Sequence, residues 1–227
     1  MELFEKIKQL EDKIRVNKYN GELKNGLPYE YIKGVGSVLV SAPHSVKHFR
    51  EGKIKSADMV TGAFALYLQE ATGCHVLYRL ANDMKDPNYD TEDEDGGYKR
   101  ELVKIVNEND IKCVIDLHGA ADSWEFDIDV GTCYTATLNG HNHLYGFIRK
   151  VAYDCGIKNV THNSVFVAPK QTVTNYVART TGIPCMQLEI NNKFRDYGRP
   201  ASVESMVRML EVVVKTMNDP CWWDTEM

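Results

Sequence analysis

Three apolar segments of the sequence end on side chains that can bind a metal or transfer a proton. The segment V-I-D-L-H-G ends on Asp116 and His118, V-L-V-S-A-P-H ends on His44, and C-M-Q-L-E-I carries Glu189 near its end. Burying such groups without a partner costs on the order of several kcal/mol. Each of them must therefore be hydrogen-bonded, exposed in a cleft or bound to a ligand.

The spacing of these side chains predicts that they meet. Side chains alternate faces along a strand, so Asp116 and His118 point the same way. In open α/β sheets, ligands bind outside the carboxyl ends of the strands, where residues such as His44 and Glu189 would also lie. One histidine at a strand end is more often structural than functional, but three strand ends carrying ionisable groups indicate a site.

Two imidazoles and a carboxylate suit a catalytic zinc site, because Zn²⁺ prefers tetrahedral nitrogen and oxygen donors and a catalytic site keeps one position open. His44 and His118 would supply the nitrogens. The sequence does not decide which carboxylate is the third ligand, and the alternatives are Asp58, Glu51 and Asp116. Asp58 would equally serve as the N-cap of the helix that follows it. Asp116, two residues before His118, would more naturally orient that imidazole from behind.

Glu189 fits the role of general base at such a centre. A carboxylate beside an activated water can take its proton during attack on a carbonyl and later pass that proton to the departing amine. The structural alternative is a strand-end glutamate paired with Lys193 or Arg195.

Hydrophobic periodicity indicates the elements that must position these groups. Leu3, Ile7, Leu10 and Ile14 form the stripe of an amphipathic helix, so residues 1–18 are expected to pack on the outside of the domain. Further helices are expected at 58–70, 98–109, 143–155, 174–180 and 203–217, and strands at 37–41, 74–78, 114–119, 127–134 and 185–190. This alternation predicts an α/β fold of three layers, α/β/α, with a mixed, largely parallel sheet.

Length and charge narrow the classes of protein. A chain of 227 residues favours a single domain, 1–227. The formal net charge of -5 and the absence of basic runs with interleaved aromatic residues argue against a nucleic-acid partner. The first residues resemble neither a signal peptide nor a membrane span, so a cytoplasmic protein without a membrane partner is expected. Trp222 and Trp223 could cover the core or mediate self-association into a homo-oligomer.

Two polar stretches are expected to be loops. The segment 81–97 is acidic and contains D-P-N-Y-D, and loops often carry binding groups. A basic block follows His44 and is either a solvated loop or an attractant for an anionic substrate: Lys47, His48, Arg50, Lys53 and Lys55.

Four short motifs occur in a characteristic order: A-P-H-S at 42–45, D-P-N-Y-D at 86–90, D-L-H-G at 116–119 and Q-L-E-I-N at 187–191. With them the chain resembles the N-formylglutamate amidohydrolase family, which is related to zinc carboxypeptidases. The resemblance runs over most of the chain, and the ordered set is more specific than any single motif.

The resemblance implies a zinc carboxypeptidase-like (phosphorylase/hydrolase-like) fold, one Zn²⁺ and hydrolysis of the amide of a small anionic N-acylated amino acid. His44 and His118 match the histidine ligands of the family. Asp58 stands where the acidic ligand on the helix is expected, and Glu189 matches the catalytic glutamate.

The sequence departs from the wider carboxypeptidase group at two places. The acid three residues after the first histidine is replaced by Lys47, and the Asn-Arg pair for the substrate carboxylate is replaced by Asn88 and Tyr89. Asn88 is expected to contact the substrate, and if the substrate is anionic another arginine must hold its carboxylate, because guanidinium binds carboxylates bidentately. Arg79 and Arg195 are the expected residues, although each could instead form a surface ion pair.

Three functions follow from these observations. The first is a zinc-dependent amidohydrolase for an N-formylglutamate-like substrate. The second is a zinc carboxypeptidase acting on peptides or cell-wall fragments, which needs a longer groove. The third is a small-molecule-binding relative that lost hydrolysis, suggested by the two departures.

Overall fold

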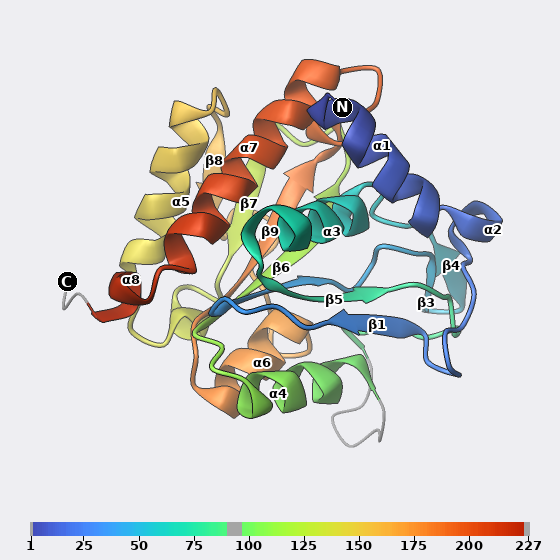
Figure 1. Cartoon of the computed structure of the whole chain (residues 1–227), viewed down its shortest axis with the longest axis horizontal. Coiled ribbons are helices and arrows are strands. Elements are labelled where there is room, and N and C mark those ends of the chain that lie inside the picture. Colours follow the sequence, from blue (N-terminus) through green and yellow to red (C-terminus); the bar gives the residue numbers. More distant parts are fainter. Residues whose placement is uncertain (1, 90–96, 225–227) are drawn as a thin grey trace.

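A seven-stranded mixed sheet forms the centre of the protein (Figure 1). The computed structural model describes residues 2–89 and 97–224. The strand order is β1-β5-β2-β6-β9-β7-β8. Strands β5, β2, β6 and β9 are parallel, β1 pairs antiparallel with β5, and β7 pairs antiparallel with β9 and parallel with β8. The predicted mixed, largely parallel sheet is confirmed.

The bounds of the elements follow in chain order. The strands are β1 Tyr29–Ile32, β2 Val38–Ala42, β3 His48–Arg50, β4 Lys53–Lys55, β5 His75–Arg79, β6 Cys113–Ala120, β7 Ile128–Gly131, β8 Val160–His162 and β9 Cys185–Asn191. The helices are α1 Leu3–Ile14, α2 Val16–Tyr19, α3 Thr61–Thr72, α4 Tyr98–Glu108, α5 His143–Asp154, α6 Val173–Thr181, α7 Pro200–Met217 and α8 Pro220–Asp224, with short 3₁₀ helices at Ala136–Leu138 and Asn192–Phe194.

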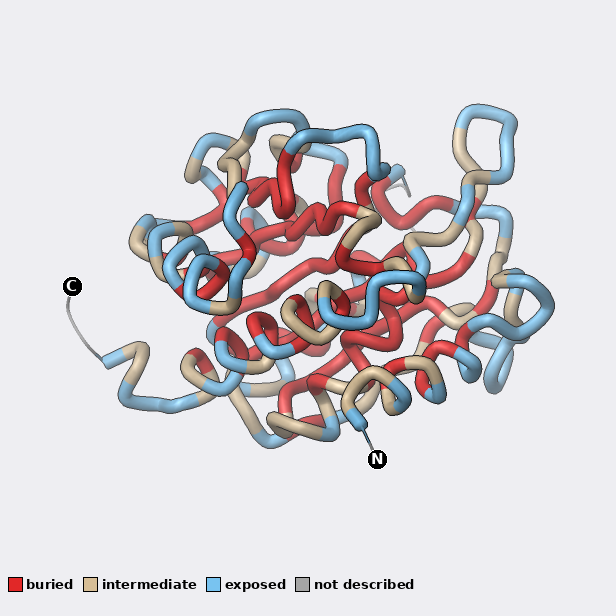
Figure 2. The backbone as a smooth tube through the Cα atoms, turned by 90° about the horizontal axis from the view of Figure 1, so that it is seen from above, coloured by how far each residue is buried: buried red, intermediate tan, exposed pale blue. Residues whose placement is uncertain are grey.

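Helices cover both faces of the sheet, as the predicted three-layer architecture requires. Helices α1, α3, α5 and α7 bury their apolar stripes on one face, and α4 and α6 pack on the other (Figure 1). The alternation of the strands divides the core, because Ile115 and Leu117 face the first group of helices and Val114 faces the second. In Figure 2 the strands run buried through the middle of the molecule while the exposed residues lie on the outside.

The same alternation places the polar strand residues on one face. Asp116 and His118 share the face of Val114, the side of α4 and α6, and Gln187 and Glu189 lie on that face of the neighbouring strand. Since Asp116 pairs with Gln187 and His118 with Glu189 in the β6–β9 register, the four side chains are direct neighbours.

Two sequence predictions need correction. Helix α3 begins at Thr61, and its N-cap is Val60 in the left-handed conformation (φ 75°), so Asp58 does not cap it. The basic block after His44 is no loop, because β3 and β4 form an antiparallel hairpin turning at Glu51 and Gly52 with positive φ. Residues 90–96, including the last residue of D-P-N-Y-D, lie outside the described residues.

Over the part of the chain that the structure describes, no helix combines the length and the apolar character needed to cross a membrane.

Candidate metal centre and active site

A polar cavity of about 360 Å³ opens at the carboxyl ends of β2, β6 and β9, where an open α/β sheet binds its ligands. It contains most of the side chains singled out by the sequence. Among the residues lining it are His44, His48, Arg50, Lys55, Asp58, Asn88, His118 and Glu189.

Three of these side chains form a compact triangle of donor atoms. His44 lies in the turn after β2, His118 lies in β6, and Asp58 precedes α3. The two Nδ1 atoms are 3.1 Å apart, and Asp58 Oδ2 lies 3.5 Å from the Nδ1 of His44 and 3.6 Å from that of His118. Tetrahedral zinc with bonds of roughly 2.1 Å separates its donors by roughly 3.4 Å. The triangle therefore fits a zinc ion.

The outer nitrogens of both imidazoles are held by buried carboxylates. His44 Nε2 lies 2.8 Å from Asp86 Oδ1, and His118 Nε2 lies 3.1 Å from Asp116 Oδ2, which also accepts from the hydroxyl of Thr174. A carboxylate at Nε2 fixes the proton there and leaves the lone pair of Nδ1 for a metal. This arrangement is typical of metal-binding histidines, and it places Asp116 behind His118 as the sequence suggested.

Negative charge accumulates around the two imidazoles. Although burial opposes ionisation, the neighbouring imidazoles of His118 and His44 hold the pKa of Asp58 far below its usual value. Burial likewise opposes ionisation of Asp86, whose pKa is lowered to about 2 chiefly by His44. Burial acts to lower the pKa of His118, but Asp116 and Asp58 raise it well above its usual value. Three carboxylates around two imidazoles thus favour an added positive charge, which a divalent cation supplies.

Glu189 lies beside this triangle, opposite His118 in the β6–β9 register. It is 7% exposed and accepts a hydrogen bond from Gln187 Nε2 at 3.3 Å. Burial raises the pKa of Glu189 to about 7, while His118 acts to lower it. A carboxylate with this pKa can both accept and return a proton near neutral pH.

The geometry separates the three acids that the sequence left open as ligands. Asp58 belongs to the donor triangle, whereas Asp116 is turned to the outer nitrogen of His118. The side chain of Glu51 is 74% exposed at the tip of the β3–β4 hairpin and does not line the cavity. Among the described residues, a second group of possible ligands, His44, His48 and Asp86, shares His44 with the triangle. It suits a cation less well, because the guanidinium of Arg50 lies 3.6 Å from Asp86 Oδ2.

Neither arginine expected to hold a substrate carboxylate lies in the cavity. The guanidinium of Arg79 is buried and donates to the carbonyl of Ala81 and to Asp83. The guanidinium of Arg195 lies behind Gly119, where an added Cβ would meet it at 2.5 Å. Backbone carbonyl oxygens and an acid of the fold bind these guanidinium groups, so the structure does not bring either arginine to the other predicted site residues.

Arg195 instead connects three segments of the fold beside the site. It donates to the carbonyl oxygens of Ile190, Met59 and Ala120 at 2.8 to 3.0 Å. Asn88 does line the cavity, and its Oδ1 accepts from the backbone N–H of Val173.

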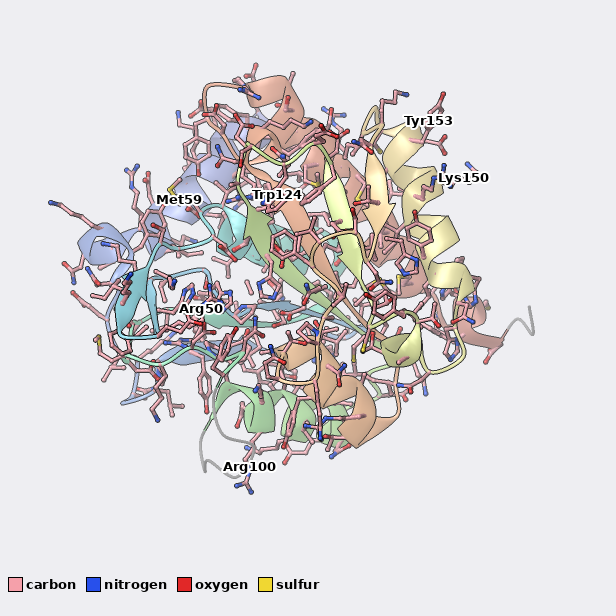
Figure 3. All side chains as sticks on the ribbon, turned by 180° about the vertical axis from the view of Figure 1, so that it is seen from behind. Arg50, Met59, Arg100, Trp124, Lys150 and Tyr153 are labelled. Atoms are coloured by element: carbon pink, nitrogen blue, oxygen red, sulfur yellow. The ribbon has the colours of Figure 1, made fainter. Side chains whose placement is uncertain are left out.

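The sequence left the basic block after His44 open as a solvated loop or an attractant for an anionic substrate, and the β3–β4 hairpin brings three of its residues to the cavity. His48 is buried and its ring stacks on that of His44, with centroids 4.0 Å apart. Arg50, labelled in Figure 3, lies over the ring of Tyr89 at 5.4 Å. Lys55 pairs with His48 across the hairpin. Strand alternation over 48–50 and 53–55, with glycine between them, was the signal that could have revealed the hairpin.

Asp86 was also missed, although its motif was noted. It is buried, and it contacts His44, His48 and Arg50. Its place in a polar loop, far along the chain from His44, hid this connection.

The fold and the donor triangle define the class as an α/β/α protein with a centre suited to one metal ion. Among solved structures, N-formylglutamate amidohydrolase from Ralstonia eutropha JMP134 superposes with a TM-score of 0.62 at 12% identity, over 84% of this chain and 98% of that chain. The fold implied by the sequence resemblance is therefore confirmed.

Two further structures share the fold. A bacteriophage poly-gamma-glutamate hydrolase matches with a TM-score of 0.54 at 15% identity, covering 90% of this chain and 94% of that chain. Gene product Atu2144 from Agrobacterium tumefaciens matches with a TM-score of 0.53 at 14% identity, covering 86% and 97%. No family model and no curated protein matches the sequence.

Proposed function

We propose that the protein is a zinc-dependent amidohydrolase that cleaves the amide of a small N-acylated amino acid resembling N-formylglutamate. The observation that carries the proposal is the triangle of His44, Asp58 and His118, with both imidazoles backed by carboxylates, beside the buried Glu189. The shared fold with N-formylglutamate amidohydrolase supports it.

His44 Nδ1, His118 Nδ1 and one oxygen of Asp58 would hold the metal. A zinc ion there would supply positive charge that acidifies a water molecule and polarises an amide carbonyl. The cavity leaves space on its open side for the substrate, as a catalytic site requires.

Glu189 moves the proton in this reaction. Its carboxylate takes a proton from the attacking water and, once protonated, delivers it to the nitrogen of the departing amine. Burial prepares it for both steps by raising its pKa to about 7, and a nearby cation would favour the ionised form that accepts the proton.

Arg50 and Lys55 replace Arg79 and Arg195 as the groups that hold the substrate carboxylate. Both line the cavity, and both side chains are about one-third exposed, at 31% and 33%. Tyr89 supports the guanidinium of Arg50 from one side. A guanidinium fixed in this way can bind a carboxylate bidentately.

Replacement of Glu189 by Gln tests the proposal. We expect purified protein to hold about one zinc per chain, and E189Q to keep it while formate release from N-formyl-L-glutamate falls by roughly two orders of magnitude or more, the scale of lost general-base help. Glu51→Gln is the matched control, because this exposed glutamate lies outside the cavity.

Two results would contradict the proposal: protein that binds no zinc when zinc is supplied, or E189Q with the turnover of the parent. A panel of acyl amino acids and short peptides, measured alongside, separates an amidohydrolase from a carboxypeptidase.

A further inference from the structure

A second cavity lies beside the first and has no role in the chemistry described above. Its volume is about 520 Å³; Trp124, Phe126 and Val165 form the apolar part of its lining, and serine, threonine, asparagine and glutamate residues form the rest. Val165 also lines the first cavity, so the two spaces share a wall. The second cavity is therefore placed to receive a part of the same substrate.

Aromatic rings form the wall between the two spaces. Trp124 stacks with Phe126 at 13° and 6.2 Å between centroids, and Phe166, which lines the first cavity, meets both rings edge-on at 5.9 and 6.1 Å. Trp124, labelled in Figure 3, stays 41% exposed. A large aromatic side chain left open beside a cavity offers a stacking surface to a ligand.

Backbone hydrogen bonds fix both walls before any ligand arrives. Asn191, two residues after Glu189, donates from Nδ2 to the carbonyl oxygens of Ala121, Trp124 and Phe126 at 2.9 to 3.3 Å. On the other side, Asp129 Oδ2 accepts from the backbone N–H of Val165 at 2.8 Å and of Phe166 at 2.9 Å. The second cavity, called the aromatic cavity from here on, is thus preformed, and Asn191 fixes its position relative to Glu189.

The order of the strands places Arg50 of the first cavity and Val165 of the second on opposite sides of the metal triangle. Arg50 contacts Asp86, in the segment after β5, whereas Val165 is held by Asp129 of β7, on the other side of β9. The histidines on β6 and after β2 and Glu189 on β9 lie between these two groups. A substrate whose carboxylate meets Arg50 therefore directs its acyl group across Glu189 toward the aromatic cavity.

Charge and size restrict that acyl group. Of the described residues lining the aromatic cavity, Glu125 alone is ionisable, and it repels an anionic group. A formyl group is about the size of one water molecule, roughly 30 Å³, and would leave the cavity nearly empty.

We propose that the cavity formed by Trp124, Phe126 and Val165 is an acyl subsite that binds an uncharged, ring-sized acyl group of the substrate. This inference rests on the proposed hydrolase function, because it takes the metal triangle as the place of the scissile amide. It names a substrate class, N-acylated amino acids with an aromatic or similarly sized apolar acyl group.

Binding measurements with matched ligands test the subsite without relying on turnover. The probes are N-formyl-, N-benzoyl- and N-succinyl-L-glutamate, titrated by calorimetry into zinc-loaded Glu189→Gln protein. We expect the benzoyl ligand to bind roughly tenfold more tightly than the formyl ligand, because its ring buries apolar surface on Trp124.

Three variants in the same background assign the preference to residues. Trp124→Ala should make the benzoyl ligand bind no more tightly than the formyl ligand, and should change the formyl affinity by no more than about twofold. Val165→Ser, in the wall shared by the two cavities, should reduce the difference in affinity between the two ligands. Glu125→Gln should strengthen binding of the succinyl ligand by removing the repelling charge. Tyr153→Ala is the control, because this exposed aromatic residue on α5, labelled in Figure 3, lies outside both cavities.

Equal affinity for the formyl and benzoyl ligands, no measurable benzoyl binding, or a benzoyl advantage that survives W124A would each overturn the subsite. Its failure is distinguishable from that of the proposed function. Hydrolysis of the formyl compound without a benzoyl preference removes only the subsite, whereas a Trp124-dependent preference in a protein that hydrolyses none of the three compounds removes only the hydrolase.

Discussion

The two ring nitrogens of His44 and of His118 face different partners, and this division makes the pair suited to a metal. Each Nε2 meets a buried carboxylate, and the two Nδ1 atoms face each other across 3.1 Å beside Asp58. If both Nδ1 atoms carried protons they would repel each other, so the arrangement is stable only with a shared proton or a cation between them.

Replacement of Asp116 tests how much the carboxylate behind His118 contributes. We expect Asp116→Asn to weaken zinc binding by roughly tenfold to a hundredfold, because His118 loses the charge that fixes its tautomer and increases its basicity. Competition with a fluorescent chelator measures the affinity.

Thr174→Val is the control for that variant, since it removes only the hydroxyl that donates to Asp116 Oδ2 and leaves the carboxylate in place. It should change zinc affinity much less. Equal losses in the two variants would contradict the assigned role of Asp116.

The raised pKa of Glu189 makes the stability of the metal-free protein depend on pH. The folded protein holds the proton of Glu189 up to a pKa of about 7, above the ordinary value of 4.5. Its stabilising contribution is therefore complete below pH 4.5 and is lost as pH rises to about 7. Glu189→Gln has no charge to bury, so its advantage in unfolding free energy over the parent should grow on the order of 3 kcal/mol from pH 4.5 to 8.

Urea unfolding of both metal-free proteins across this pH range measures the difference. A difference that stays constant with pH would show that Glu189 titrates normally.

At the scale of elements, helix α1 determines the path of the segment that carries Asp58. Glu11 Oε1 accepts from the backbone N–H of Val60 at 2.8 Å and from the hydroxyl of Tyr19 at 2.7 Å. Val60 adopts φ 75°, which is strained for a β-branched residue and persists only when its surroundings enforce it. The contact from α1 thus holds the chain two residues beyond Asp58, the proposed acidic ligand.

Glu11→Ala should lower the free energy of unfolding by about 2 to 3 kcal/mol, because it leaves the buried N–H of Val60 and the partly buried hydroxyl of Tyr19 without their acceptor. It should also weaken zinc binding through Asp58. Glu11→Gln keeps an acceptor oxygen and should lose much less unfolding free energy and zinc affinity, as chemical denaturation and zinc titration would show. Equal effects of the two variants would mean that the charge of Glu11, and not its hydrogen bonds, is what matters.

The helices and strands with a strong hydrophobic periodicity were predictable from the sequence. Those that form only because of contacts with distant parts of the chain were not. The predicted strand at 114–119 and the predicted helix at 203–217 correspond to β6 and α7, because apolar alternation and helical stripes are local signals. Strands β3, β4 and β8 have three residues each, so any alternation of side chains within one of them is a weak signal by itself.

The residues of the candidate site likewise fall into a group that the sequence indicated and a group that it did not. His44, His118 and Glu189 were found because each ends an apolar strand, whereas Asp86 and Arg50 reach the site only through the fold. The positions of the two arginines were not predictable, because spacing along the chain cannot tell whether a guanidinium faces a cavity or binds backbone carbonyl oxygens, as that of Arg195 does.

At the scale of the whole molecule, the three proposed metal ligands come from segments that lie far apart along the chain. His44 follows β2, His118 lies in β6 and Asp58 precedes α3, with Arg195 linking the last two regions through Met59 and Ala120. A metal bound by all three ligands connects these segments only in the folded state, so its binding adds to global stability.

Removal of zinc should therefore lower the thermal midpoint of the whole protein. Zinc at a hundred times its Kd contributes about 2.7 kcal/mol to the folded state. For a chain of this length each kcal/mol shifts Tm by roughly 2 to 4 °C, so chelation should lower Tm by roughly 5 to 10 °C and added zinc should restore it. His118→Ala should abolish this zinc-dependent shift, whereas His141→Ala, a histidine outside the donor triangle, should keep it. If H118A kept the full shift in calorimetry, the ion that stabilises the fold would be bound somewhere other than the triangle.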